Sequence, residues 1–198
     1  MIRFFTNREL SSILDINLAK WKRWSREFLP PDPLGGMQSG VARHYSIDDA
    51  FTVFLGGHLV ADHKFSIPET RQILQDLRPW LEGAGVYLTG KIQEQFKRRL
   101  QPVVKEYTIY ISRDAKAPKR HPMFCYLMKG ILSRQLLKRG DISIKEEQFI
   151  EIDIVPDTAN DYDNFTQKML NISAVLLRFT QLLNLEKALF PILVNDQK

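Results

Sequence analysis

Helix-capping motifs, each followed by apolar residues at helical spacing, divide the first part of the chain. In these motifs a Ser or Thr is followed three residues later by Glu or Asp, so that each side chain bonds a backbone N–H group near the other. The motif starts at Thr6, Ser46 and Ser66. It predicts three helices, which end near Leu14, near His63 and before Gly83. Another helix is predicted over Leu18–Phe28, after the short turn Asp15–Asn17.

A hairpin is predicted between the helix over Leu18–Phe28 and the helix that starts at Ser46. The segment opens at Pro30 and Pro31, which cannot continue a helix, and holds the turn-forming pair Gly35 and Gly36. Strand character returns over Val41–Tyr45. The order helix, turn, helix and hairpin is that of a winged helix-turn-helix.

The second half of the chain shows a different pattern. Apolar and polar residues alternate over Tyr107–Ser112 and Gln148–Val155, which predicts two strands. Helices are predicted over Lys91–Lys105, which is strongly basic, over Pro122–Arg139 and over Tyr162–Leu189. The last helix has apolar residues four and three positions apart, as in a helix packed along a partner. These residues are Phe165, Met169, Ile172, Leu176, Phe179 and Leu183.

These patterns predict an α+β fold that is mainly helical. A winged helix-turn-helix domain is expected over residues 1–85. A C-terminal β-α-β-α module, for dimerisation or for sensing a partner or ligand, is expected over residues 86–198.

Composition sets limits on the class of protein. With 198 residues, 44% of them hydrophobic, the chain can bury a core. Its single cysteine, Cys125, cannot form an internal disulfide, and the first residues have no signal-peptide run, so a cytoplasmic location is expected. No apolar run approaches the roughly 20 residues of a membrane span, so no membrane association is expected.

Charge is segregated in the second half, although the net charge of +5 is small. Arg113–Arg139 holds eight basic residues and one acid, whereas Asp141–Asp163 holds eight acids and one base. An ion-pair layer within the molecule is the simpler interpretation, and a second nucleic-acid surface is the alternative.

The helix over Leu18–Phe28 has two unlike faces. Trp21, Trp24 and Phe28 lie on one side, and Lys22, Arg23 and Arg26 lie on the opposite side. Lys20 adds a further cation near the helix start. This is the arrangement of a recognition helix in the major groove, where cations meet phosphates and guanine edges. A helix that only exposes its charges to water is the alternative.

Several short stretches now support a family resemblance. They are Phe5-Thr6 with Glu9-Leu10, Ile16-Asn17, Lys22–Pro30, Arg43–Asp49 and Phe65–Ile67. Over about the first 80 residues the chain resembles the MerR-like winged-helix transcription regulators of bacteria. The resemblance implies that the second helix contacts the major groove of double-stranded DNA and that the hairpin contacts the minor groove or the DNA backbone.

Carried onto this sequence, the resemblance assigns the DNA-binding residues. The recognition-helix contacts would be Lys20, Lys22, Arg23 and Arg26, and the wing contacts would be Arg43 and Tyr45. Tyr45 is equally consistent with a place in the core.

Departures from the family concern packing and dimerisation. Trp21 stands where smaller aliphatic residues are usual, Phe28 stands where Gly is common, and the linker before Arg43 is long. The region after the fourth helix, where family members commonly dimerise, contains Gly83, Gly85 and Gly90. A homodimer is therefore assigned to Tyr162–Leu189, with packing inside the chain as the alternative.

Catalytic, metal and cofactor chemistry is not indicated. His121 and Cys125 supply only two potential ligands, and His58 and His63, five residues apart on the predicted helix, do not face one site. The aromatic and Met-rich run Met123–Met128 is more consistent with core than with a ligand pocket, so a small-molecule effector stays open. The prediction is a bacterial or phage transcription regulator that acts by binding DNA without catalysis. A protein-interaction module and an excisionase-like architectural protein are the alternatives.

Overall fold

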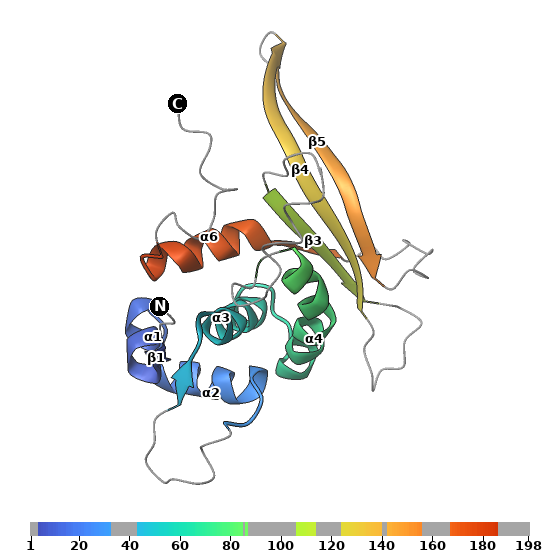
Figure 1. Ribbon diagram of the computed structural model, residues 1–198. Helices are drawn as coiled ribbons and strands as arrows, with labels where there is room; N and C mark the ends of the chain where they lie inside the picture. The colour runs from blue at the N-terminus through green and yellow to red at the C-terminus, as the bar shows by residue number, and fades with distance from the viewer. Residues whose placement is uncertain are drawn as a thin grey trace. The chain divides into compact units, whose positions relative to one another are not determined.

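The computed structural model describes residues 4–32, 43–84, 86, 106–113, 124–139, 142–155 and 167–185 (Figure 1). These residues form five helices and two antiparallel sheets, which confirms the α+β class. They divide into two compact units, and the boundary between the units falls within α6 (Ile172–Leu182). The first unit holds the residues described between 4 and 86 together with 176–185, and the second holds those between 106 and 175.

Four helices build most of the first unit: α1 (Asn7–Ile13), α2 (Leu18–Phe28), α3 (Ile47–Ala61) and α4 (Ile67–Gly83). All three predicted capping boxes are present, at Thr6, Ser46 and Ser66. Because each box depends only on residues three apart, the sequence pattern located these helix starts correctly.

Two short strands join the start of the chain to the segment before α3. Strand β1 (Phe5–Thr6) pairs antiparallel with β2 (His44–Tyr45), so that Phe5 lies opposite Tyr45. The predicted strand over Val41–Tyr45 is present at its described end, but its partner β1 was not predicted. The turn expected at Gly35 and Gly36 and the helix expected over Lys91–Lys105 lie outside the described residues. The complete wing thus stays a prediction.

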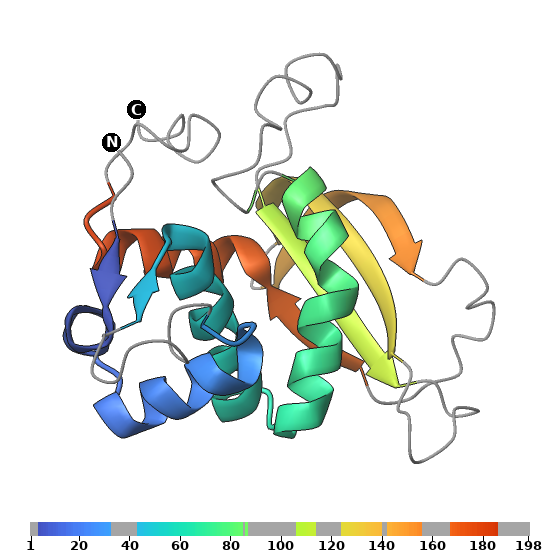
Figure 2. The same ribbon diagram turned by 60° about the horizontal axis from the view of Figure 1, so that its bottom comes forward.

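The C-terminal half of α6 completes the core of the first unit. This part of α6 lies beside α3 (Figure 2). The Phe179 ring lies 5.2 Å from the Phe51 ring and 5.4 Å from the Phe54 ring of α3, and Leu176 and Leu183 are buried. The apolar face assigned to a dimer seam within Tyr162–Leu189 is therefore covered inside the chain over this part. Residues 176–185, which the prediction assigned to the C-terminal domain, lie in the first compact unit.

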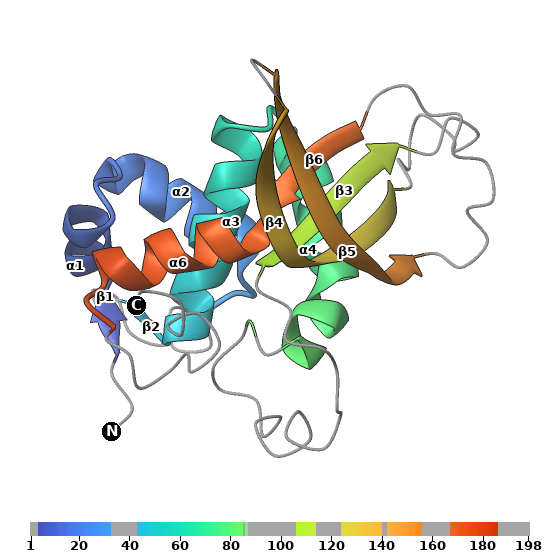
Figure 3. The same ribbon diagram turned by 90° about the horizontal axis from the view of Figure 1, so that it is seen from above.

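The second unit contains a four-stranded antiparallel sheet with the order β5-β4-β3-β6 (Figure 3). Its strands are β3 (Glu106–Arg113), β4 (Phe124–Arg139), β5 (Ile142–Val155) and β6 (Gln167–Asn171). The predicted strands within β3 and β5 are confirmed. Past Ile131, β4 is paired with β5 alone, and the two strands continue as a ribbon (Figure 1).

Two predicted helices of this half are wrong. The segment Pro122–Arg139 forms strand β4 from Phe124 onward, and the predicted helix over Tyr162–Leu189 begins only at Ile172, after β6. Over the described residues, the order of elements in this half is thus β-β-β-β-α rather than β-α-β-α. At the change from strand to helix, the Asn171 Oδ1 accepts a hydrogen bond from the Ala174 N–H at 2.8 Å, as an N-cap does.

One face of this sheet is its buried core. The buried residues of this face are Ile109, Ile111, Phe124, Tyr126, Met128 and Leu170. Phe124, Tyr126 and Met128 are thus core residues, as the simpler interpretation of the aromatic and Met-rich run expected.

The basic and acidic segments of the second half are adjacent strands. In the register of β4 and β5, Arg134 lies opposite Glu147 and Lys129 lies opposite Glu151. The Lys129 Nζ is 3.6 Å from the Glu151 Oε1, and it also lies over the Phe149 ring at 4.2 Å. This confirms the prediction that the two segments face each other within the molecule.

Candidate nucleic-acid interface

The direction of α2 is set by the turn that precedes it. Asp15 has a φ of 52°, in the left-handed region, which lets the chain reverse sharply after α1. Asn17 then caps α2, because its Oδ1 accepts hydrogen bonds from the N–H groups of Ala19 at 3.0 Å and Lys20 at 3.2 Å. Helix α2 has the predicted bounds.

The inner face of α2 is held against α3 by two aromatic rings and two glycines. Trp21 and Trp24 are buried, as predicted. A Cβ atom added to Gly57 would lie 2.2 Å from the Trp24 Cζ3, and one added to Gly56 would lie 2.4 Å from the Phe28 Cδ2. Rings of α2 therefore pack directly on the backbone of α3, which fixes the rotation of α2 about its axis.

Tyr45 is a core residue, which is the alternative that the sequence left open beside a contact with DNA. Its side chain is 1% exposed, and its ring packs edge to face with Trp21 at 5.8 Å. Its hydroxyl donates to the Asn7 Oδ1 at 2.7 Å and lies 3.1 Å from the Ser25 Oγ. Tyr45 thus ties strand β2 to α1 and α2, and a DNA phosphate cannot reach it.

The outer face of α2 carries four exposed cations. They are Lys20, Lys22, Arg23 and Arg26. Within the described part of the chain, no carboxylate forms an ion pair with any of them, whereas Glu27 of the same helix pairs with Arg71 of α4. The Lys20 Nζ lies over the Trp24 ring at 4.9 Å. The predicted separation of aromatic and cationic faces is confirmed, which leaves the cationic face available to a polyanion.

Arg43 directly precedes β2 in the chain. Its guanidinium carbon is 5.6 Å from the centre of the Tyr45 ring, and its side chain is half-buried. Because stacking on a buried ring restricts the long side chain, Arg43 is more ordered than an isolated surface arginine.

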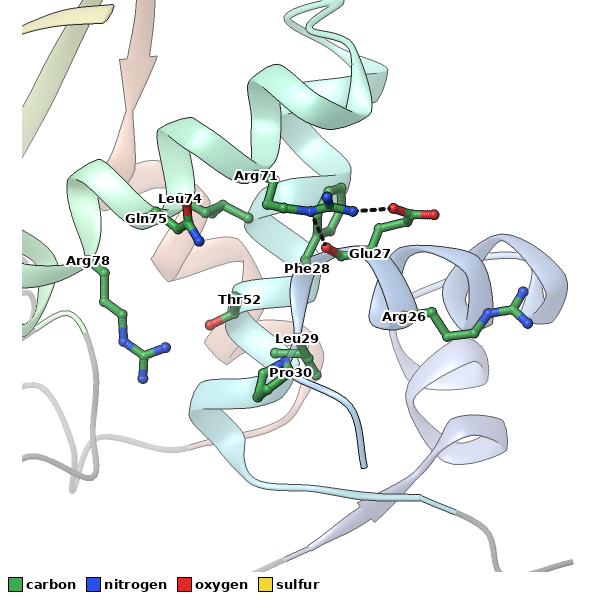
Figure 4. A pocket seen from close by; sticks show the side chains of 10 residues that line it. All are labelled: Arg26, Glu27, Phe28, Leu29, Pro30, Thr52, Arg71, Leu74, Gln75 and Arg78. Atoms are coloured by element: carbon green, nitrogen blue, oxygen red, sulfur yellow. Dashed lines mark hydrogen bonds and ion pairs between the residues drawn. The ribbon is translucent and has the colours of Figure 1, made fainter. Parts of the chain in front are cut away.

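A pocket of about 490 Å³ lies at the C-terminal end of α2, between that helix, α3 and α4 (Figure 4). The Arg71 Nη2 lies 2.6 Å from the Glu27 Oε2, and the Arg71 Nε donates to the backbone oxygen of Glu27 at 3.0 Å. Arg71 therefore satisfies a carbonyl at the end of α2, one of those that a helix leaves without an internal partner.

The two histidines at the end of α3 meet, contrary to the prediction. Helix α3 ends at Ala61, and the His63 N–H donates to the His58 backbone oxygen at 3.4 Å, which keeps the two residues close. The rings of His58 and His63 are 5.1 Å apart, and the His58 Nδ1 is 2.5 Å from the Asp62 Oδ2. In the described segments, no group of three His, Cys, Asp or Glu side chains is arranged to hold a metal ion.

Three features of the interface were missed by sequence reasoning. Gly56 and Gly57 stand in the middle of a helix, where glycine is unfavourable, and this was a signal of close packing. The hydrogen bonds of Tyr45 and the ion pair of Arg71 join residues far apart in sequence, so no local pattern marks them.

Comparisons with known proteins add no family. No protein-family model matches the sequence, and no curated protein matches it. No described helix has the length and apolar character needed to cross a membrane.

Proposed function

We propose that this chain is a DNA-binding protein of the MerR-like type, which regulates transcription by binding and carries out no catalysis. The observation that supports it is the outer face of α2, where Lys22, Arg23 and Arg26 are exposed opposite two buried tryptophans, with Lys20 exposed near the helix start. An α-helix fits the major groove of B-form DNA, and a helix fixed by ring-to-backbone packing presents its cations in a defined orientation.

The four cations have different roles in this proposal. Lys22 and Arg26 contact phosphates, which supply most of the affinity because each neutralised phosphate releases a counterion. Arg23 contacts a base, since a guanidinium can bond both the O6 and the N7 of guanine. Lys20 adds a further phosphate contact, as does Arg43 outside α2.

The test measures binding of a random-sequence DNA duplex to the full chain. Fluorescence anisotropy reports the affinity at a series of increasing salt concentrations. We expect affinity to fall by about 10³-fold or more between 50 and 200 mM salt if six or more phosphates are contacted, and by less for fewer contacts. The triple variant Lys22→Ala/Arg23→Ala/Arg26→Ala should lose this binding.

A matched variant controls for net charge. Lys64, Arg113 and Arg178 are exposed cations outside α2 and β2, and replacing all three with Ala removes the same charge. The proposal expects this variant to bind DNA almost as well as the unchanged chain. Equal loss in both triple variants would show that only overall charge matters.

Two other results would favour a different function. Failure to bind duplex at any salt concentration would favour the protein-interaction module. Binding that bends the duplex without any effect on transcription would favour an excisionase-like architectural role.

A further inference from the structure

The pocket at the end of α2 combines an apolar floor with a cationic edge. Phe28 and Leu29 of the α2 end and Leu74 of α4 supply the apolar part, and Leu29 and Leu74 are themselves buried. Its volume of about 490 Å³ lies within the range of roughly 300–1,000 Å³ that is typical of small-molecule sites. All of its lining belongs to the first unit.

The cationic edge is built on one face of α4. Arg71, Gln75 and Arg78 are four and three residues apart, so they lie along the same side of the helix (Figure 4). The side chains of Arg71 and Arg78 are 51% and 62% exposed, so a solute can reach both. Arg26 also lines the pocket, but its guanidinium points away from the other side chains (Figure 4).

The two arginines of the cationic edge, Arg71 and Arg78, each bind a carboxylate of the protein itself. Glu27 places its carboxylate on the Arg71 Nη2 at 2.6 Å, and Glu82 binds the Arg78 Nε at 2.8 Å. Guanidinium groups hold carboxylates through more than one N–H group, so a second oxyanion can share the same edge. Among the lining residues other than Arg26, two arginines stand against one acid, Glu27, which favours an anion over a cation as the occupant.

The apolar floor favours an anion with an apolar body over a purely polar anion such as phosphate. A phosphate alone would use the arginines and leave the apolar surface in contact with water. An anion with an apolar body would also cover Phe28, Leu29 and Leu74, and burial of apolar area contributes about 25 cal/mol per Å².

We propose that this pocket binds a small amphipathic organic anion, with its carboxylate at Arg71, Gln75 and Arg78 and its apolar body on the floor formed by Phe28, Leu29 and Leu74. Apart from Arg26, whose guanidinium points away from the other lining side chains, this site shares no residue with the cationic face of α2, and it does not depend on DNA binding. At the arginine edge, the ligand carboxylate shares or replaces the position that Glu27 holds on Arg71.

The test is a titration of the full, ¹⁵N-labelled chain with 1-naphthoate, in which the amide chemical shifts are measured at each naphthoate concentration. We expect saturable shifts confined to the end of α2, to Thr52 and to the stretch from Arg71 to Arg78. The uncharged analogue 1-naphthalenemethanol and inorganic phosphate should each bind about tenfold more weakly or worse, because each lacks half of the interaction.

Variants locate the site. Arg78→Gln should weaken naphthoate binding by about tenfold, and Gln75→Trp, which fills the mouth of the pocket, should abolish it. Arg178→Gln makes the same substitution at an exposed position of α6 and should leave the affinity unchanged. The amide spectrum of each variant without naphthoate shows whether it is folded.

Four outcomes would overturn the proposal: no saturable shifts, shifts centred elsewhere, phosphate binding as tight as naphthoate binding, or equal effects of Arg78→Gln and Arg178→Gln. Because no DNA is present, none of them bears on the proposed function of α2.

Discussion

At the scale of single residues, Gly57 controls how closely α2 approaches α3. An alanine there would place its Cβ 2.2 Å from the Trp24 ring, a distance that real contacts do not reach, and the ring belongs to a buried side chain that cannot move freely. We expect Gly57→Ala to destabilise the first unit by about 1–3 kcal/mol, as overpacking does. Chemical unfolding followed by tryptophan fluorescence measures this change.

A second glycine provides the control. An added Cβ at Gly83, the last residue of α4, meets nothing within 4 Å, so Gly83→Ala should leave stability unchanged or raise it by up to about 1 kcal/mol. Similar losses in the two variants would show that helix propensity, rather than ring packing, governs position 57.

Tyr107 of β3 gives a pH-dependent measurement for the second unit. Burial raises the pKa of its hydroxyl above the ordinary value of 10.0, because the phenolate is poorly solvated there. The raised pKa belongs to the folded state, so the stability linked to Tyr107 is complete below pH 10.0 and is lost as pH rises through the folded-state pKa.

The prediction is therefore a loss of stability on the alkaline side. Between about pH 9 and pH 11, the denaturant midpoint of the unchanged protein should fall more than that of Tyr107→Phe, which has no group to ionise. Parallel falls in both proteins would show that burial of Tyr107 does not contribute.

Periodicity predicted which side chains of α2 turn inward, but not what they meet. Spacing alone placed Trp21 and Trp24 opposite Lys22, because the turn of a helix is a local property. The burial of Tyr45 depends on Asn7 and Ser25, which are 38 and 20 residues away, so its role could not be predicted from neighbours in sequence.

At the scale of elements, the helices of the first unit were predictable and the central strand of the second was not. Capping boxes act within four residues, and all three are present. Strand β4 is rich in Leu, Met, Lys and Arg, which favour helices, yet it lies between β3 and β5. Its structure is decided by pairing with distant strands, and this tertiary context overrides propensity.

Helix α6 shows the same limit and supports a direct test. Its apolar spacing was predicted correctly from Ile172 to Leu183 but not at Met169, which is exposed in β6. The sequence also did not predict that Phe179 contacts Phe51 and Phe54 of α3, far away in sequence. We expect Phe179→Ala to lower the free energy of unfolding of the first unit by about 3–5 kcal/mol, because it leaves a cavity beside α3. The loss should be visible in a thermal unfolding transition.

Leu177 is the matched position on the same helix. Its side chain is 43% exposed, so Leu177→Ala should change stability by no more than about 0.5 kcal/mol. If Leu177→Ala were as harmful as Phe179→Ala, the exposed face of α6 would be covered in solution, which would revive a role for this helix in self-association.

At the scale of the whole molecule, the net charge of +5 says less than the placement of the charges. In the second unit, Lys129 and Arg134 lie opposite Glu151 and Glu147 on the neighbouring strand, and Lys129 forms an ion pair with Glu151. The cations of α2 have no such partner among the described residues, so they present a concentrated positive charge on the first unit.

Salt dependence separates the roles that we propose for these cations. If Lys22 and Arg26 each neutralise one phosphate, Lys22→Ala and Arg26→Ala should each reduce the slope of log affinity against log salt by about 0.9. Both should weaken binding to all sequences alike. Arg23→Ala should instead cost about 1–3 kcal/mol on the preferred sequence, relax the choice of base at one position and change non-specific binding little.

The comparison requires the preferred duplex, which selection from random DNA with the unchanged chain would supply. Arg178→Ala, with the same loss of charge on α6, should leave both the slope and the base preference intact. A common loss of slope in all three α2 variants, with no change in base preference, would mean that α2 lies across the phosphate backbone and not within the major groove. Sequence would then have to be read by another element or through the shape of the duplex.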